Sequence, residues 1–294
     1  MRVATWNIRW FPDAVLEPER GAPGTDIQWL TCAVTALDAP VLAVQEFRSH
    51  EQARKKTREL LQALDVRTGG NWKVELDACP GEGTHVGFIY DAARVHAGEF
   101  RTVSALSATG SCEQGQHPGL AGRFDFGAFD ATLVSVHFMW GYSTESLRLR
   151  REARARLGSV VENIARETGD DEVIVLGDFN TNGTRDVRPA LTMQAEVEEL
   201  ATVAAGGSMA LHLLPADQRC TQIEPDGRVY PLDHVLLTQP AEERLTEDVA
   251  RVGGLCALTA CSKIDPKSTA HYRRLSDHCP VSIEFGSPPA RQTG

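Results

Sequence analysis

Short apolar runs alternate with amphipathic segments along the whole chain. The runs are rich in Val, Ile, Leu and aromatic residues and have the length of buried β-strands; they span residues 2–8, 41–47, 72–76, 85–91, 131–138, 172–179, 234–238 and 281–285. No Pro/Gly/Ser-rich linker and no repeat of fixed period divides them. We therefore expect one mixed α/β domain over residues 1–285 and a disordered tail over 286–294.

Helical patterns lie between these runs. Residues 25–38 and 50–65 are two of them, and residues 143–168 are the clearest, because their apolar side chains recur at the spacing of one helix face: Leu157, Val160, Val161 and Ile164. Ser143 or Thr144 is the expected N-cap of this helix. Its arginines from Arg148 to Arg156 are interleaved with Glu and are expected on a solvated face.

The composition of the 294 residues, with 42% hydrophobic and 24% charged, is that of a globular protein with a sizeable core. The formal net charge of -10 argues against a protein that holds nucleic acid by bulk positive charge. It does not exclude an enzyme that acts on phosphates, because a bound divalent cation supplies local positive charge.

The 7 cysteines include no zinc-type C-x-x-C pair, and free buried thiols are the simplest interpretation. A disulfide between Cys79 and Cys112 is the alternative, and it would matter in an exported chain. No basic-then-apolar signal follows Met1, so a cytoplasmic location is the default expectation, with secretion if a signal peptide has been removed. No apolar stretch approaches the roughly 20 residues that span a bilayer, which argues against membrane insertion.

Many of the apolar runs end in polar side chains. Taken singly, such a residue is usually a turn former or a cap. Together they contain the parts needed for metal-assisted attack of water on a phosphoryl group: Asn7, Glu46, His137, Asp178, Asn180, Asp233, Asp277 and His278.

These side chains suggest a division of work. Glu46, with an oxygen from Asn7 or Asp277, offers the hard ligands that Mg²⁺ prefers. Asp233 or Asp277 could orient His278, because a carboxylate fixes the tautomer of an imidazole and stabilises its protonated form. Amides such as those of Asn7 and Asn180 can donate to phosphate oxygens.

The ordered strings "TWNI", "VQE", "SVHF", "GDFN", "LDHV" and "SDHCPV" resemble the endonuclease/exonuclease/phosphatase superfamily, and "VQEFRSH" resembles its deoxyribonuclease I branch. The match runs from Asn7 to Val281. This resemblance implies a four-layer α/β/β/α sandwich (α+β by some schemes), in which two mixed β-sheets pack face to face with helices outside. It also implies a divalent-metal-dependent hydrolase of phosphodiester bonds, in the first place a deoxyribonuclease I-like nuclease.

By the same resemblance, Glu46 is the principal metal ligand, with Asn7 and Asp277 close to the ion, which would be Mg²⁺ with Mn²⁺ or Ca²⁺ as alternatives. The other motif residues are expected in catalytic roles: His278 as acid/base or phosphate contact paired with Asp233, Asp178 orienting the attacking water, Asn180 binding phosphate, and His137 as second catalytic histidine. The substrate would be nucleic acid or another phosphodiester, with no obligate protein partner.

Two positions depart from the deoxyribonuclease pattern. Thr84 or His85 stands where a glutamate would support His137. Where a substrate-binding arginine is expected, the only arginine in the stretch is Arg123, and the alignment places Gln116 or His117 at the matching position. The superfamily also contains enzymes for small-molecule, inositol-phosphate and phospholipid head-group substrates, so these remain alternatives. A catalytically inactive interaction module is a more remote one. Met139, Trp140 and Tyr142 follow His137, and they either stack on a flat substrate group or pack on the sheet.

Overall fold

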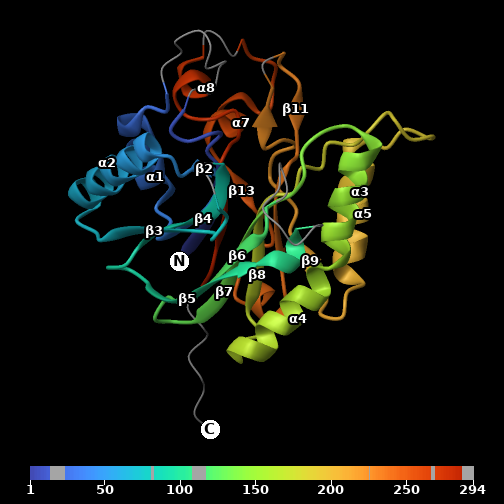
Figure 1. Ribbon diagram of the computed structural model, residues 1–294, viewed down its shortest axis with the longest axis horizontal. Coiled ribbons are helices and arrows are strands. Elements are labelled where there is room, and N and C mark those ends of the chain that lie inside the picture. Colours follow the sequence, from blue (N-terminus) through green and yellow to red (C-terminus); the bar gives the residue numbers. More distant parts are fainter. Residues whose placement is uncertain (14–23, 81–82, 108–116, 225, 266–268, 287–294) are drawn as a thin grey trace.

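Two six-stranded mixed β-sheets form the centre of the computed structural model, which describes residues 1–13, 24–80, 83–107, 117–224, 226–265 and 269–286 (Figure 1). The first sheet has the order β13-β14-β1-β2-β4-β3, with β1 Arg2–Asn7, β2 Val41–Arg48, β3 Trp72–Leu76, β4 Thr84–Asp91, β13 Arg251–Val252 and β14 Val281–Glu284. The second has the order β5-β6-β7-β8-β12-β9, with β5 His96–Val103, β6 Gly119–Asp125, β7 Asp130–His137, β8 Val173–Asp178, β9 His212–Leu213 and β12 Asp233–Leu237.

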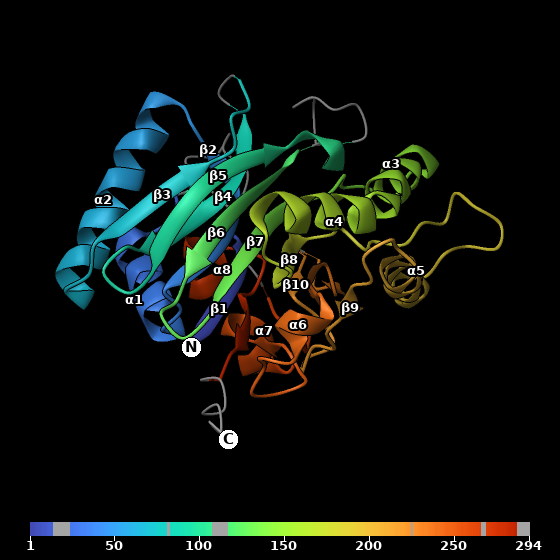
Figure 2. The ribbon, with the colours of Figure 1, turned by 90° about the horizontal axis from the view of Figure 1, so that it is seen from below.

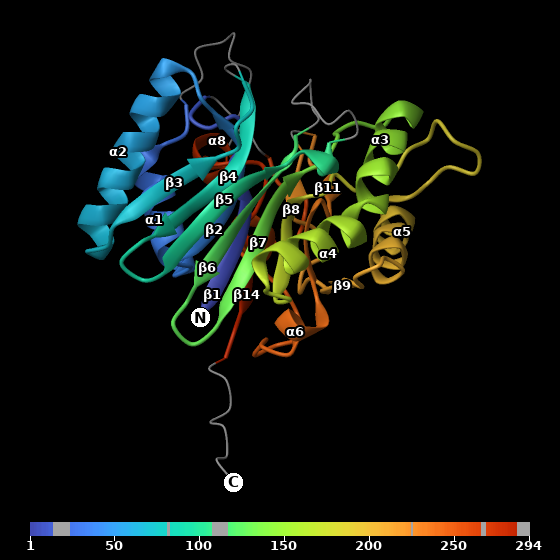
Figure 3. The ribbon, with the colours of Figure 1, turned by 60° about the horizontal axis from the view of Figure 1, so that its bottom comes forward.

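Helices cover the outer faces of both sheets. Helices α1 Ile27–Leu37 and α2 Glu51–Thr68 lie on the first sheet, and α4 Leu157–Thr168 lies on the second, with α3 Thr144–Ala155 and α5 Met193–Ala205 beside it (Figures 2 and 3). The remaining elements belong to the connecting segments; they are the 3-10 helix Ser104–Leu106, the hairpin of β10 Gln222–Ile223 and β11 Val229–Tyr230, α6 Gln239–Glu242, α7 Gly254–Thr259 and α8 Ala270–Arg274.

Side chains of the inner strands point alternately to two cores, which is why these strands read as continuous apolar runs. In β8, Ile174 and Leu176 join the core between the sheets, while Val173 and Val175 pack against α4 and its neighbours. A third core lies between the first sheet and α1 and α2. Three apolar layers between four layers of secondary structure confirm the predicted α/β/β/α sandwich.

The helix predicted over residues 143–168 is wrong in one respect, because it is divided at Arg156 into α3 and α4. Ser143 is the N-cap, as expected, and accepts a hydrogen bond from the backbone N of Ser146. The division has a packing reason: α4 buries aliphatic side chains on the sheet, whereas α3 turns two arginines, Arg150 and Arg154, inward toward α5. The expectation that the whole arginine run is solvated is therefore wrong for these two.

Strands β5 and β6 and helix α5 have no counterpart in the sequence prediction. Strand β5 lies at a sheet edge and is largely exposed, so it lacks the apolar run by which inner strands are found. Within the described residues, no helix combines the length and apolar character that a membrane crossing requires. The predicted tail lies outside the described residues from 287 onward.

Between described residues, two disulfides join Cys220 to Cys261 and Cys256 to Cys279. The expectation of free buried thiols is therefore wrong for these four residues, whose partners lie 41 and 23 residues apart and cannot be paired from spacing alone. Cys32 is free and exposed. The predicted pairing of Cys79 with Cys112 cannot be described, because Cys112 lies outside the described residues.

Candidate active site

Three neighbouring strands of the second sheet bring three of the predicted side chains into one row. In the register of β7, β8 and β12, His137 lies opposite Asp178, and Asp178 lies opposite Asp233. Gly177 makes this possible: its φ is +147°, and a Cβ there would lie 2.1 Å from the carbonyl oxygen of Val136. The motif "GDFN" thus needs its glycine so that β8 can approach β7 immediately before Asp178.

The first sheet contributes Asn7 from the end of β1 and Glu46 from β2. Glu46 lies where the pairing of β2 with β4 is irregular, and its φ of +61° is unusual for a residue other than glycine. The Asn7 side-chain Nδ2 donates to Glu46 Oε1 and to Asp178 Oδ2, both at 3.0 Å. One amide therefore connects two carboxylates that belong to different sheets.

The imidazole of His278 lies between two carboxylates, those of Asp233 and Asp178. Its Nδ1 lies 2.9 Å from Asp233 Oδ2, and its Nε2 lies 3.8 Å from Asp178 Oδ2. Burial alone would lower the pKa of His278, but the charges of Asp233 and Asp178 outweigh it and raise the pKa to about 10. The imidazole is therefore protonated at neutral pH. Thr221 supports the pair, because its Oγ1 accepts from the backbone N of Asp233 and its carbonyl accepts from that of Cys279.

His137 lacks such a partner. Its Nε2 lies 3.6 Å from Asp178 Oδ2 and 3.8 Å from Glu46 Oε1, while its buried Nδ1 has no hydrogen-bond partner among the described residues. Its ring stacks on that of His117, with centroids 5.0 Å apart and planes 7° apart, and His117 Nε2 lies 3.2 Å from Thr84 Oγ1. Burial, helped by the two nearby histidines, holds the pKa of His137 well below 6.5, so this imidazole is neutral.

The two acidic groups nearest the centre are themselves buried. Desolvation raises the pKa of Asp178 to about 7, although the positive charge of His278 opposes it. Desolvation also raises the pKa of Glu46, against the hydrogen bond from Asn7. Both carboxylates are thus short of positive charge, and the side chain of Glu46 is 16% exposed.

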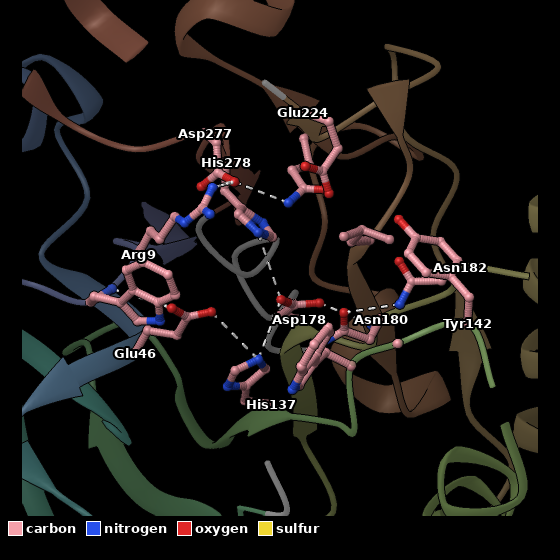
Figure 4. Close-up of a pocket in the computed structure, with 15 residues that line it drawn as sticks. Arg9, Glu46, His137, Tyr142, Asp178, Asn180, Asn182, Glu224, Asp277 and His278 are labelled. Carbon is pink, nitrogen blue, oxygen red and sulfur yellow. Dashed lines mark hydrogen bonds and ion pairs between the residues drawn. The ribbon is translucent and has the colours of Figure 1, made fainter. Parts of the chain in front are cut away.

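Asp277, the third predicted metal ligand, is paired with Arg9 and accepts from Gln222 Nε2 at 3.1 Å. The guanidinium of Arg9 also lies 4.8 Å from the centre of the Trp10 ring. Figure 4 shows Arg9 between Asp277 and Glu46 at one side of the site. Unlike Glu46, Asp277 is therefore already paired with a positive side chain.

A pocket of about 370 Å³ opens at this point, and its lining includes Glu46, His137, Asp178, Asp277 and His278. Asn180 and Asn182 lie on one side of it: Asn180 Nδ2 donates to the Phe138 carbonyl at 2.9 Å, and its Oδ1 accepts from Asn182 Nδ2 at 3.2 Å (Figure 4). Trp140 and Tyr142 also line the pocket and are 65% and 41% exposed. A flat group beside a bound phosphate would meet these two rings.

The donor atoms around Glu46 fit a divalent cation. The Asn7 amide turns its Nδ2 toward the carboxylates, and its buried Oδ1 has no partner among the described residues. An orphaned amide oxygen near an under-compensated carboxylate is the kind of hard donor set that Mg²⁺ takes. A second group of ligand atoms, from Asp178, Asp233 and His278, lies within 4.8 Å of one another, but there the protonated imidazole already balances the carboxylates.

Eight of the ten site residues predicted from the sequence come together here. Arg123 does not: it lies on β6, is exposed and pairs with Asp130. His117 lies behind His137 and does not line the pocket. Of the three residues expected beside the site after His137, Met139 does not line the pocket either, and its carbonyl oxygen accepts a hydrogen bond from Arg150.

Besides Gly141 and Leu232, five pocket residues were missed by the sequence reasoning: Arg9, Trp10, Asn182, Gln222 and Glu224. Three of them lie within two positions after the motifs "TWNI" and "GDFN", and that proximity could have identified them. The other two lie on or beside the short strand β10, where the sequence carries no periodic signal.

No family model and no curated protein matches this sequence. Solved structures do match over almost the whole chain. An endonuclease/exonuclease/phosphatase family protein from Leptotrichia buccalis is 16% identical, with a TM-score of 0.64 over 97% of this chain and 99% of that one. D. rerio TDP2, complexed with a single-strand DNA product, is 16% identical, with a TM-score of 0.59 over 97% and 98% of the two chains.

The 3' phosphatase NExo from Neisseria, bound to a product DNA hairpin, is 14% identical, with a TM-score of 0.58 over 97% of this chain and 99% of that one. At such identities the likeness establishes the fold. It agrees with the two face-to-face sheets and the helices outside them. The chain has the deoxyribonuclease I-like fold, a four-layer α/β/β/α sandwich.

Proposed function

We propose that this protein is a divalent-metal-dependent phosphodiesterase, and that nucleic acid is its substrate. The proposal rests above all on the convergence of Asp178, His278 and Glu46 from two sheets into one pocket. A structural role would not need three buried ionisable groups with shifted pKa values at the open end of a sandwich.

The cation would be held by Glu46 and Asn7, with Asp277 nearby. When bound, it polarises the phosphoryl group and stabilises negative charge on the leaving oxygen. Asn7 also donates hydrogen bonds to the carboxylates of Glu46 and Asp178, and it thereby fixes the position of each for its separate role.

The side chains of the chain do the remaining work. Asp178 orients the attacking water and takes its proton, because its carboxylate lies between both histidines and its pKa is raised to about 7. His278 holds a phosphate oxygen as a protonated imidazole, and Asp233 preserves that charge. The oxygen of water bonds to phosphorus as the opposite P–O bond breaks, in line, and the leaving oxygen receives a proton from the charged His278.

The preference for nucleic acid has two supports. Trp140 and Tyr142 offer exposed rings for base stacking beside the phosphate site. Two structural neighbours, TDP2 and NExo, are described with DNA products. The net charge of -10 does not oppose this, since the pocket would meet the phosphate through its cation and His278.

A panel of substrates tests the proposal. Plasmid DNA, single-stranded DNA, RNA, bis-p-nitrophenyl phosphate and p-nitrophenyl phosphate are assayed with Mg²⁺, Mn²⁺ or Ca²⁺ and with EDTA. We expect diester hydrolysis that disappears with EDTA and in Glu46→Gln. Near-normal turnover in EDTA would refute metal dependence, and activity on the monoester alone would replace the nuclease by a phosphatase. A folded protein inert toward every substrate would favour the interaction module.

A further inference from the structure

Three charged side chains are buried behind the pocket and have no part in the proposed chemistry. Arg150 and Arg154 on α3 and Glu196 on α5 are each at most 2% exposed. Burying charges costs several kcal/mol per ion unless they are paired and fully hydrogen-bonded. Their contacts show what this arrangement holds in place.

Arg150 joins α5 to the segment that carries the aromatic rings. Its Nε and Nη2 donate to Glu196 Oε1 and Oε2 at 2.7 and 3.1 Å, a two-point pairing of guanidinium with carboxylate. Its Nη1 donates to the carbonyl oxygens of Met139 and Gly141 at 3.2 and 2.8 Å. These two carbonyls flank Trp140, so the backbone on both sides of the ring is fixed.

The same carboxylate holds the segment that carries the asparagines. Glu196 Oε2 accepts from the backbone N of Gly183 at 2.6 Å, and its Oε1 also accepts from Arg154 Nη2 at 2.7 Å. Arg154 Nη2 reaches the Phe179 carbonyl at 3.3 Å. The two segments are also joined directly, because Thr184 Oγ1 donates a hydrogen bond to the carbonyl oxygen of Tyr142.

We propose that Arg150, Arg154 and Glu196 are positioning residues that set the width of the pocket between its aromatic side, Trp140 and Tyr142, and its amide side, Asn180 and Asn182. By fixing this width they select substrates that carry a nucleoside next to the reacting phosphate. This inference rests on the proposed phosphodiesterase activity and deepens it.

Arginine is needed at position 150 because of its shape. Its planar fork makes two bonds to Glu196 and two to backbone carbonyls at once, and the ammonium of a lysine cannot reproduce that geometry. Arg150→Lys therefore keeps the charge but frees the backbone around Trp140. None of the three residues contacts His137, Asp178 or His278 through its side chain in the described interactions, so the chemistry itself should be spared.

Two esters with the same leaving group separate binding from chemistry. They are methyl p-nitrophenyl phosphate and the p-nitrophenyl ester of thymidine 5′-phosphate. In Arg150→Lys we expect KM for the thymidine ester to rise about tenfold, with kcat changed by less than about threefold and the methyl ester unaffected. Arg151→Lys is the matched control, because Arg151 lies on the same helix and pairs with Glu199 of α5 at the surface. It should change neither ester.

Thr184→Val is a milder second variant, since it removes the direct bond to Tyr142 and leaves the buried charges intact. It should raise KM for the thymidine ester by about threefold. An equal rise in KM for both esters, or no rise in either variant, would overturn the positioning role. If Arg150→Lys fails to fold, Thr184→Val decides between these outcomes.

Hydrogen exchange gives a readout that does not need activity. The backbone amides of residues 139–142 and 180–183 should exchange faster together in Arg150→Lys and remain unchanged in Arg151→Lys. Faster exchange in only one of the two segments would refute the coupling. A wild-type protein that hydrolyses neither ester would contradict the proposed function, whereas the exchange experiment would still decide whether the buried charges hold the two sides together.

Discussion

The two histidines of the site lie on opposite sides of Asp178 and differ in what stands behind them. His278 has the carboxylate of Asp233 at 2.9 Å, and its pKa is raised to about 10. His137 has no hydrogen-bond partner at Nδ1 among the described residues, stacks on His117, and its pKa falls well below 6.5. Of these two imidazoles, that of His278 is thus a cation and that of His137 is neutral, although both face the carboxylate of Asp178.

This difference assigns different work to residues of one type. A charged imidazole can hold phosphate and donate a proton, whereas a neutral one that resists protonation cannot serve as the acid at neutral pH. The carboxylate behind the ring, rather than the distance to Asp178, makes the distinction, because both Nε2 atoms lie within 3.8 Å of it.

The largest effect is expected from Asp178→Asn, which removes the carboxylate that both histidines face. Hydrolysis of bis-p-nitrophenyl phosphate should fall by roughly 10³-fold or more, because the attacking water loses both orientation and a proton acceptor. Single-turnover kinetics with saturating metal measures the loss, and circular dichroism checks the fold. A variant that retains a tenth of the wild-type rate would remove Asp178 from the mechanism.

Asp233→Asn tests the charged side alone. Without that carboxylate, burial lowers the pKa of His278, so the alkaline fall in kcat should move from near pH 10 toward or below pH 6.5. At pH 8 we expect a loss of about 10² to 10⁴-fold. The control is His137→Gln, which should slow the reaction without shifting the alkaline limb. If both variants shift the limb equally, the two histidines do not differ as described.

Stability should depend on the same pair. The folded pKa of His278, about 10, lies above the ordinary value of 6.5. The stabilisation by the ion pair is therefore complete below pH 6.5 and is lost as the pH rises through about 10. Urea unfolding of the wild type at pH 6, 8 and 10 should give a falling free energy of unfolding, and Asp233→Asn should flatten this trend. An unchanged slope in the variant would show that other groups cause it.

The smallest effect is expected at His117. His117→Phe keeps a ring against His137 and should leave kcat within about threefold of wild type, whereas His117→Ala should cost about 1 kcal/mol of stability through the lost stacking. Thermal unfolding and the pH profile of kcat measure the two effects. A large loss of kcat in His117→Phe would mean that the imidazole itself, rather than its flat face, supports His137.

The strand ends of this fold could be predicted because their signal is local. Asp178 and Asn180 follow an apolar run directly, and the pairing of β7, β8 and β12 then places His137 and Asp233 on either side. Regular strand register thus converts separate local motifs into one site. The apolar runs themselves predicted a mixed α/β domain, because strands buried on both faces lack polar alternation, whereas the four-layer arrangement came from the resemblance of the motifs.

Contacts made by side chains of distant segments could not be predicted in this way. Arg9 meets Asp277 across 268 positions of sequence, and no pattern near either residue indicates the pair. His137 has the stacked ring of His117 beside it where the resemblance led us to expect an acidic partner. This contact depends on where the start of β6 lies relative to β7, which hydrophobic periodicity does not predict. Local sequence patterns therefore predict which ionisable side chains belong to the site, whereas contacts between distant segments set their pKa values.

Each of the two described disulfides contains a cysteine that lies in or beside the segment around the charged His278. Cys279 follows His278 directly, and Cys220 precedes Thr221, which binds the backbone of both Asp233 and Cys279. The thiol–disulfide balance of the surroundings therefore acts directly on the segments that carry His278 and Thr221, next to the candidate site. Reduction of these two disulfides would free the backbone on both sides of the Asp233–His278 pair, so we expect a reductant to weaken this ion pair.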